Sequence, residues 1–116
     1  MTTNKDSTRF YSNMQEKQVC MELNAYNQSN SGAGHFRKGD CINKKASLLI
    51  ECKTTMKSKE SVAIKQEWVK KLKEEAFTQR MSYTCIAFNY EPGGSNYYVI
   101  DSKLMQFLVD KLENVE

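Results

Sequence analysis

The sequence predicts an α/β domain in which a mixed central sheet is flanked by helices. Three segments carry apolar residues at helical spacing, and four shorter segments carry the apolar and aromatic runs typical of strands. They follow one another in the order α-β-β-α-β-β-α, which indicates a sheet covered by helices. The 116 residues contain no internal repeat and fit a single domain over residues 1–116, of which residues 1–6 are expected to be flexible.

The N-terminal segment predicts a helix over residues 7–26. Its apolar residues roughly follow one helical stripe: Phe10, Met14, Val19, Met21 and Leu23. Residues 27–34 contain two glycines and several small polar residues, so they predict a loop that permits tight turns. A short additional strand near Gly34 is compatible with this composition.

Two strands are predicted over residues 37–43 and 46–53, with a turn at residues 43–46. The second strand is apolar on both faces until it reaches Glu51, a pattern typical of a central strand. The pair therefore forms a hairpin whose second strand lies inside the sheet.

The C-terminal half predicts a long helix, a hairpin and a final helix. The helix covers residues 58–79, where Ser58 or Ser61 would cap it and Trp68 would lie in the core rather than stack on a base. Two strands follow, over residues 83–89 and 97–100, joined by a proline- and glycine-rich turn, with one of Tyr97 and Tyr98 facing inward. Asp101 or Ser102 then caps a helix that ends near Leu112.

Positive charge is concentrated in one segment. Residues 36–73 hold eleven Lys and Arg against four acidic residues, whereas the rest of the chain holds six against ten. This asymmetry favours a polyanionic partner; the alternative, for any one of these lysines, is that it only solvates a helix face. The sequence shows neither a membrane-spanning run nor a signal peptide, so we expect a soluble, cytoplasmic protein.

The four cysteines form no CxxC pair and no cluster with histidine, which argues against a zinc site. Cys41 and Cys52 fall within the predicted strands. We expect the cysteines to be free, buried thiols in a reducing compartment.

A candidate catalytic constellation lies on the predicted hairpin. Side chains alternate across a strand, so Glu51 and Lys53 emerge on one face. A turn centred on residues 44–45 would set Asp40 opposite Leu49, on that same face and diagonally close to Glu51.

Two carboxylates and an ammonium group at the end of a sheet suggest a divalent cation, because close like charges need compensation. Oxygen ligands without nearby histidine or cysteine side chains favour Mg²⁺, or Mn²⁺ as a substitute, over zinc. Such a cation would activate a water and stabilise charge at a phosphate, while Lys53 would orient the attacking water. The alternative is structural: the acids are solvated and Lys53 simply pairs with Glu51.

At these residues the sequence resembles the PD-(D/E)XK nuclease superfamily, whose hallmark is an Asp followed by a hydrophobic strand ending in Glu-x-Lys. The matching stretch runs from Gly39-Asp40 to Leu49-Ile50-Glu51-Cys52-Lys53. Within that superfamily it is most similar to the small Holliday junction resolvases, archaeal-type and phage relatives, which also have a helix acid and a Ser-Gly loop. The resemblance covers residues 16–100 and implies a restriction-endonuclease-like fold.

The resemblance implies a role for each matching residue. Asp40, Glu51 and the main-chain carbonyl of Cys52 would bind the metal, Lys53 would be the catalytic lysine, and Glu16 would reach the metal directly or through water. Glu22 competes with Glu16 for this role, because the two are expected to lie nearly two turns apart on a similar helix face.

The remaining inferences concern DNA. Ser31 would contact the DNA backbone near the scissile phosphate. The sequence departs from the family hallmark at Gly39, where the hallmark has proline. The basic and polar residues expected to contact DNA are Ser31, Arg37, Lys38, Lys57 and Lys65.

The resemblance implies a Mg²⁺-dependent DNA endonuclease, specifically a Holliday junction resolvase acting as a homodimer in a bacterial or phage-infected cell. Two alternatives stay open. One is a nuclease of the same fold that cuts other DNA, at nicks, flaps or duplex. The other is a DNA-binding module without catalysis, against which the intact acids argue, because binding a polyanion needs no carboxylates.

Overall fold

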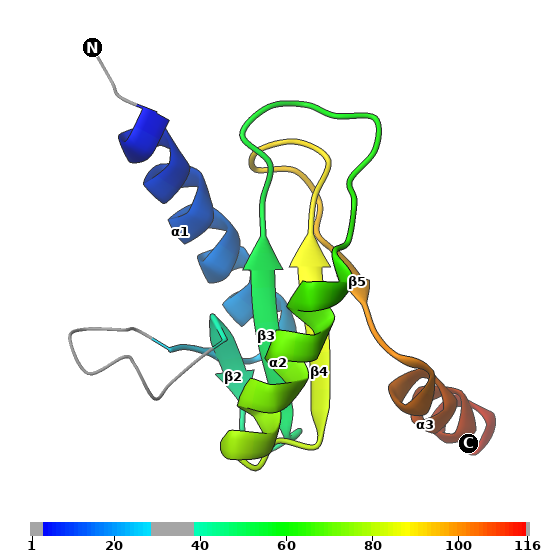
Figure 1. Ribbon diagram of the computed structural model, residues 1–116. Helices are drawn as coiled ribbons and strands as arrows, with labels where there is room; N and C mark the ends of the chain where they lie inside the picture. Colours follow the sequence, from blue (N-terminus) through cyan, green and yellow to red (C-terminus); the bar gives the residue numbers. More distant parts are fainter. Residues whose placement is uncertain (1–3, 29–38, 116) are drawn as a thin grey trace.

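The computed structural model describes residues 4–28 and 39–115, in which three helices flank a five-stranded mixed sheet (Figure 1). In chain order the elements are α1 (Asn4–Leu23), β1 (Tyr26–Asn27), β2 (Cys41–Asn43), β3 (Leu48–Lys53), α2 (Gln66–Thr78), β4 (Tyr83–Phe88), β5 (Tyr97–Val99) and α3 (Ser102–Glu113). The predicted fold class, an α/β domain with a mixed sheet between helices, is confirmed.

The strands lie in the order β1-β2-β3-β4-β5, so β3 is the central strand, as predicted. Only the pair β3 and β4 is parallel among the described strand pairs, and the others are antiparallel. Parallel neighbours require a crossover connection, and α2 supplies it. Because β2 and β3 are antiparallel, the C-terminal end of β3 lies beside the N-terminal end of β2.

Each face of the sheet has its own core. In Figure 1, α2 crosses in front of the sheet and the C-terminal half of α1 passes behind it. The core under α1 contains Val19, Cys41, Ile50, Cys85 and Ala87. The core under α2 contains Ile42, Leu49, Leu72, Ala76 and Ile86. Neighbouring residues of β3 thus belong to opposite cores, as the alternation of strand side chains requires.

The N-terminal helix is displaced from its predicted bounds. It begins at Asn4 instead of residue 7 and ends at Leu23, because Asn24 takes a left-handed conformation with φ of 51°. The chain then forms β1, where the sequence predicted the end of a helix and the start of a loop. The additional strand predicted near Gly34 falls outside the described residues.

The second helix also starts later than predicted. The sequence predicted a helix from residue 58, whereas α2 begins at Gln66, and its N-cap Lys65 makes no side-chain capping bond. Ser58 and Ser61 therefore do not cap it. The preceding segment is held in an extended loop, in which the Lys59 amide donates to the Tyr90 carbonyl at 2.8 Å. By contrast, the predicted cap of α3 is confirmed: the Asp101 carboxylate accepts a bond from the Leu104 amide at 2.9 Å.

The helices are interrupted by charged and polar residues. The longest, α1, has 20 residues. Within the described ranges, no helix has both the length and the apolar character that crossing a bilayer would require.

Candidate active site

The central strand changes character along its length, as the sequence predicted. Leu49 and Ile50 are fully buried. Glu51 and Lys53 follow with side-chain exposures of 25% and 33%. The same strand thus anchors itself in both cores and presents two charged groups at its C-terminal end.

Lys53 lies between an acid and an aromatic ring. Its Nζ is 3.4 Å from Glu51 Oε2 and 4.5 Å from the centroid of the Trp68 ring. Trp68 packs against the core under α2, as predicted, and its ring also holds the lysine. An aromatic face attracts an ammonium group, so the contact restricts where the Lys53 side chain points.

Asp40 reaches the site by a route that the sequence did not predict. In the observed register Cys41 pairs with Ile50, and Ile42 with Leu49, so the predicted pairing of Asp40 with Leu49 is wrong. The Asp40 amide donates to the Ile50 carbonyl at 2.8 Å. Its Oδ2 accepts a bond from the Cys52 amide at 2.7 Å. The carboxylate therefore lies beside β3, at the Cys52 amide. It does not occupy the position opposite Leu49 from which it was predicted to lie diagonally close to Glu51.

Gly39 permits this entry into the sheet. Its φ is 83°, a left-handed conformation, and a Cβ at this position would lie 2.7 Å from Leu49 Cδ1. Only a glycine fits both the conformation and the close approach without strain. The departure from the hallmark proline thus has a local physical reason.

The main-chain carbonyl of Cys52 points to the same edge as Asp40. The amide and carbonyl of one strand residue project to the same side of the strand. The Cys52 amide is bonded to Asp40, so the Cys52 carbonyl also faces the Asp40 side of β3. Two of the oxygen ligands implied by the resemblance therefore share one edge.

The pKa values of Asp40, Glu51 and Glu16 are all raised, mainly by burial. The pKa of Glu51 is raised first by burial and then by the charge of Asp40, and Lys53 opposes both effects. The pKa of Asp40 is raised by burial, against the Cys52 amide bond and the charge of Lys53. The pKa of Glu16 is raised by burial and by Asp40, against a hydrogen bond from Asn27. These groups form one electrostatic cluster with too little positive charge to balance it.

Glu16 and Glu22 point to different parts of the sheet, although the sequence suggested a similar face. Asn27 Nδ2 donates to Glu16 Oε1 at 2.9 Å, beside β1, and Glu16 senses the charge of Asp40. The carboxylate of Glu22 instead accepts bonds from Tyr98 on β5 and from Asn96. Of the two acids, Glu16 is the one coupled to the site.

The donor set fits a hard divalent cation. The Asp40 and Glu51 carboxylates and the Cys52 carbonyl supply oxygen atoms, and the raised pKa values show that added positive charge would stabilise the site. Within residues 4–28 and 39–115, no three His, Cys, Asp or Glu side chains are grouped closely enough to hold a metal ion. Glu16 is therefore not grouped with Asp40 and Glu51 as a direct third side-chain ligand.

Two buried amides hold the end of β3 in position, and neither was predicted. Gln15 is 2% exposed, and its Nε2 donates to the carbonyls of Lys53 at 3.3 Å and of Ala87 at 3.4 Å. Asn89 is fully buried, and its Oδ1 accepts a bond from the Thr55 amide at 3.1 Å. Gln15 precedes Val19 by four residues, so a polar residue on the buried helical stripe was the available signal.

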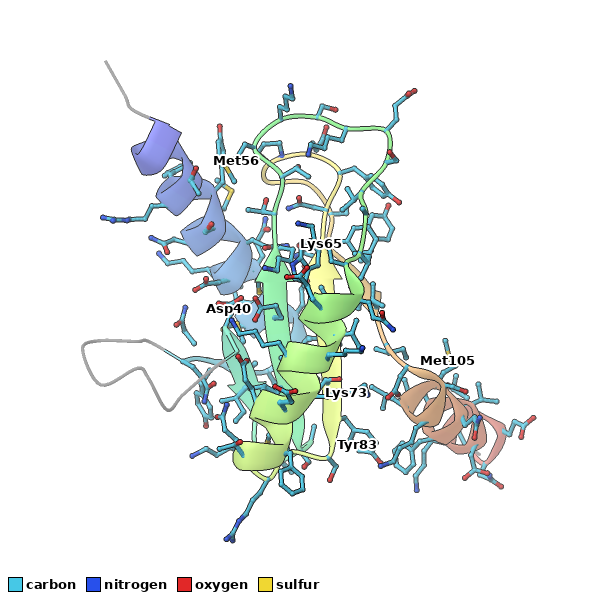
Figure 2. All side chains as sticks on the ribbon, in the orientation of Figure 1. Asp40, Met56, Lys65, Lys73, Tyr83 and Met105 are labelled. Atoms are coloured by element: carbon cyan, nitrogen blue, oxygen red, sulfur yellow. The ribbon has the colours of Figure 1, made fainter. Side chains whose placement is uncertain are left out.

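A basic hollow of about 520 Å³ begins at the end of β3 and extends under the loop over residues 54–65. Figure 2 shows Met56 and Lys65 at this end of the molecule, beyond the sheet. Four of its lining residues are lysines: Lys53, Lys57, Lys59 and Lys65. Lys57 and Lys65 were predicted to contact DNA, and Lys59 was missed. The predicted contacts Ser31, Arg37 and Lys38 lie outside the described residues.

Comparison of the chain with family models, curated proteins and solved structures returned no match. The functional assignment therefore depends on the geometry of this site and on the motif resemblance.

Proposed function

We propose that this chain is a Mg²⁺-dependent DNA endonuclease, and specifically a resolvase of four-way DNA junctions. The observation that carries the proposal is the meeting of Asp40, Glu51 and Lys53 at the end of the central strand. The Asp40 carboxylate is bonded to the amide between the other two residues, and Lys53 contacts Glu51. A purely structural site would not retain repelling, half-buried acids without a compensating ligand.

In this proposal Asp40, Glu51 and the Cys52 carbonyl hold the cation. When bound, Mg²⁺ supplies charge neutralisation at the phosphate and favours deprotonation of water. Lys53, directed by Glu51 and Trp68, orients the attacking water and stabilises negative charge at the phosphate. Glu16 acts through water, since it is coupled to Asp40 while bonded to Asn27.

The basic hollow supports a polyanionic substrate. It borders Lys53 directly, so a nucleic-acid backbone lying in it would place a phosphate beside the carboxylates. Resolution of a four-way junction requires two paired cuts, so the proposal includes a homodimer with two such sites.

The test is cleavage of a labelled four-way junction beside a matched linear duplex, with Mg²⁺. We expect symmetric nicks confined to the junction, a loss of at least about 100-fold in Asp40→Asn and Glu51→Gln, and a comparable loss in Lys53→Ala. Glu74→Gln is the matched control, because it removes an exposed carboxylate on α2, and it should cleave like the wild type.

Other results would point elsewhere. Nicks in duplex or flap substrates at equal rates would favour a nuclease of broader specificity. Tight DNA binding without any cleavage would favour the non-catalytic module. Cleavage that survives Asp40→Asn or Glu51→Gln would refute the assigned site.

A further inference from the structure

The C-terminal helix α3 exposes an apolar stripe. Met105, Leu108, Val109 and Leu112 stand at positions i, i+3, i+4 and i+7, which lie on one face of a helix. Their exposed fractions are 51%, 42%, 44% and 74%. Such a stripe normally faces a core, and here it faces solvent.

Two residues next to the stripe, Leu104 and Phe107, attach α3 to the domain. Leu104 is 9% exposed, and the Phe107 ring lies 5.8 Å from the Tyr83 ring at the start of β4. Lys73 on α2 forms an ion pair with Asp101, the N-cap of α3. In Figure 2, Met105 lies on the side of α3 away from Tyr83. The stripe therefore borders the buried Leu104 on its Leu108 side, and its four residues remain exposed.

We infer that this stripe is a dimer interface in which α3 packs antiparallel against α3 of a second copy of this chain. A two-fold interface must be complementary to itself. A two-fold axis passing between positions 108 and 109 sets Met105 against Leu112, and Leu108 against Val109. The order of the stripe is unchanged by this reversal, so every apolar residue meets an apolar residue.

The charges of α3 favour a second copy over other partners. Its charged residues are Lys103, Asp110, Lys111 and Glu113, which sum to zero, and none lies in the stripe. Two such helices can approach without the repulsion expected of a chain with net charge +3. A helix that binds anionic lipid or DNA needs a basic polar face, which α3 lacks.

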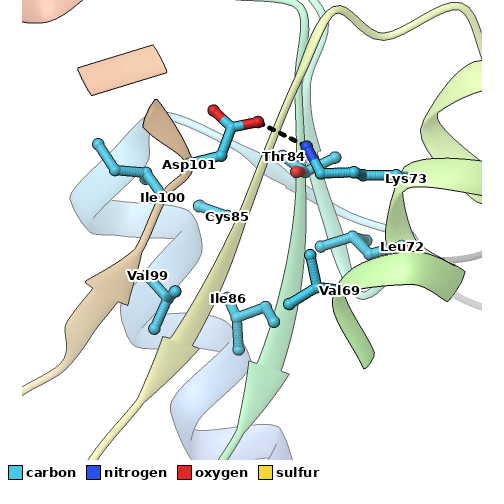
Figure 3. Close-up of a pocket in the computed structure, with 9 residues that line it drawn as sticks. All are labelled: Val69, Leu72, Lys73, Thr84, Cys85, Ile86, Val99, Ile100 and Asp101. Carbon is cyan, nitrogen blue, oxygen red and sulfur yellow. Dashed lines mark hydrogen bonds and ion pairs between the residues drawn. The ribbon is translucent and has the colours of Figure 1, made fainter. Parts of the chain in front are cut away.

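An apolar hollow lies next to the N-terminus of α3. It has a volume of about 140 Å³ and runs between α2, β4 and β5 to Asp101. Figure 3 shows its apolar walls, among them Val69, Val99 and Ile100. In the antiparallel pairing, position 115 of the second copy is level with Ser102, next to Asp101. Val115, which is 71% exposed, would therefore lie near the N-terminus of α3 of the other copy.

The test is the oligomeric state of the full chain, measured by sedimentation velocity from about 1 to about 200 µM. We expect a concentration-dependent monomer–dimer equilibrium. Leu108→Asp should weaken association by at least about 10-fold, because it places two carboxylates near the axis. Phe77→Asp is the matched control, since Phe77 is 85% exposed on α2, and it should associate like the wild type. Circular dichroism and the thermal midpoint verify that each variant is folded.

A charge-pair variant tests the antiparallel register. Leu108→Lys alone should be monomeric. Adding Val109→Asp should restore association, because each new ammonium group then faces the new carboxylate of the other copy. A parallel helix pair would instead bring like charges together and stay dissociated.

A wild type that stays monomeric over the whole range would overturn the interface and leave the stripe to a different protein. So would a Leu108→Asp variant that dimerises normally. The interface gives a surface to the homodimer of the nuclease proposal, but the cleavage chemistry at Asp40 and Glu51 does not depend on it. If the nuclease proposal alone fails, the chain dimerises through α3 and cleaves nothing; if the interface alone fails, the chain cleaves and α3 variants leave its association unchanged.

Discussion

At the scale of single residues, Asp40 has two separable roles. Its carboxylate accepts a hydrogen bond from the Cys52 amide at 2.7 Å, which is a structural contact, and its charge is the one that the proposed cation would neutralise. Substitutions that keep one role and remove the other can therefore distinguish fold from function.

Asp40→Asn should keep the acceptor and lose the charge, whereas Asp40→Ala loses both. Without metal, we expect Asp40→Asn to be at least as stable as the wild type. Asp40→Ala should be less stable than Asp40→Asn by about 1–3 kcal/mol, because it leaves the Cys52 amide without its acceptor. Urea unfolding of the metal-free proteins measures this difference. Equal stabilities of the two variants would mean that the hydrogen bond contributes nothing.

The raised carboxyl pKa values give the site a defined pH dependence. A carboxyl group with a raised pKa in the fold binds protons more tightly in the folded than in the unfolded chain. Such a group therefore favours the folded chain at low pH. This contribution to the free energy of unfolding is lost as the pH rises from the ordinary pKa, 3.8 for Asp and 4.5 for Glu, through the raised pKa of the folded chain.

We expect the free energy of unfolding of the metal-free wild type to fall relative to that of Asp40→Asn over this pH range. The comparison cancels the groups that Asp40 does not influence, so the difference reports Asp40 together with its effect on Glu51 and Glu16. Urea unfolding from about pH 4 to about pH 8 measures it, and Mg²⁺ at the upper end should restore stability to the wild type in preference to the variant. A difference that rises with pH would show that the site is not short of positive charge.

At the scale of elements, the entry of the chain into β2 decides where Asp40 lies. Gly39 has a positive φ, and its hydrogen faces Leu49, which is fully buried and cannot move aside. Gly93 has a similar φ of 75°, but a Cβ there would meet only the flexible Met14 side chain, at 3.3 Å. The two glycines form a matched pair that separates backbone strain from collision.

Gly39→Ala should cost about 2–4 kcal/mol, through backbone strain and the collision with Leu49. Gly93→Ala should cost about 1–2 kcal/mol through strain alone. We expect junction cleavage to fall with Gly39→Ala, because Asp40 shifts along β3, and to persist with Gly93→Ala. Denaturant unfolding and cleavage rates check both effects. Equal loss of activity in the two variants would show that the conformation at Gly39 does not position Asp40 for cleavage.

At the scale of the whole molecule, lysines lie at both ends of the sheet, and one group of them lines the hollow. The hollow beside Lys53 is lined by Lys57, Lys59 and Lys65, whereas Lys44 and Lys45 lie in the turn at the opposite end of β3. Electrostatic binding of DNA depends on the number of phosphates that lysines neutralise, so it should depend on the first group.

We expect the triple variant of Lys57, Lys59 and Lys65 to alanine to bind a four-way junction more weakly. The slope of log affinity against log salt should drop by up to about 3, one for each lost phosphate contact. Fluorescence anisotropy over a salt series measures the slope, in an Asp40→Asn background that prevents cleavage. The Lys44→Ala, Lys45→Ala double variant is the control for lost net charge. An equal change in that control would show that DNA does not lie in the hollow.

The sequence by itself determined the succession of the elements apart from β1, the central position of β3 and the polar residues that end it. These features follow from local periodicity and from the change of Leu-Leu-Ile to Glu-Cys-Lys. Both patterns depend only on side-chain alternation and burial along one strand or helix. The cap of α3 at Asp101 is equally local. The grouping of Asp40 with the Glu51–Lys53 pair was predicted, although the route by which Asp40 arrives was not.

Only the tertiary structure decided the hairpin register, the late start of α2 and the choice between Glu16 and Glu22. Each depends on partners distant in the sequence: the Asp40 carboxylate on the Cys52 amide, the Lys59 amide on the Tyr90 carbonyl, and Glu22 on Tyr98. Backbone amides and carbonyls are the same in every residue, so a residue pattern shows which face is buried but not which distant group completes each bond.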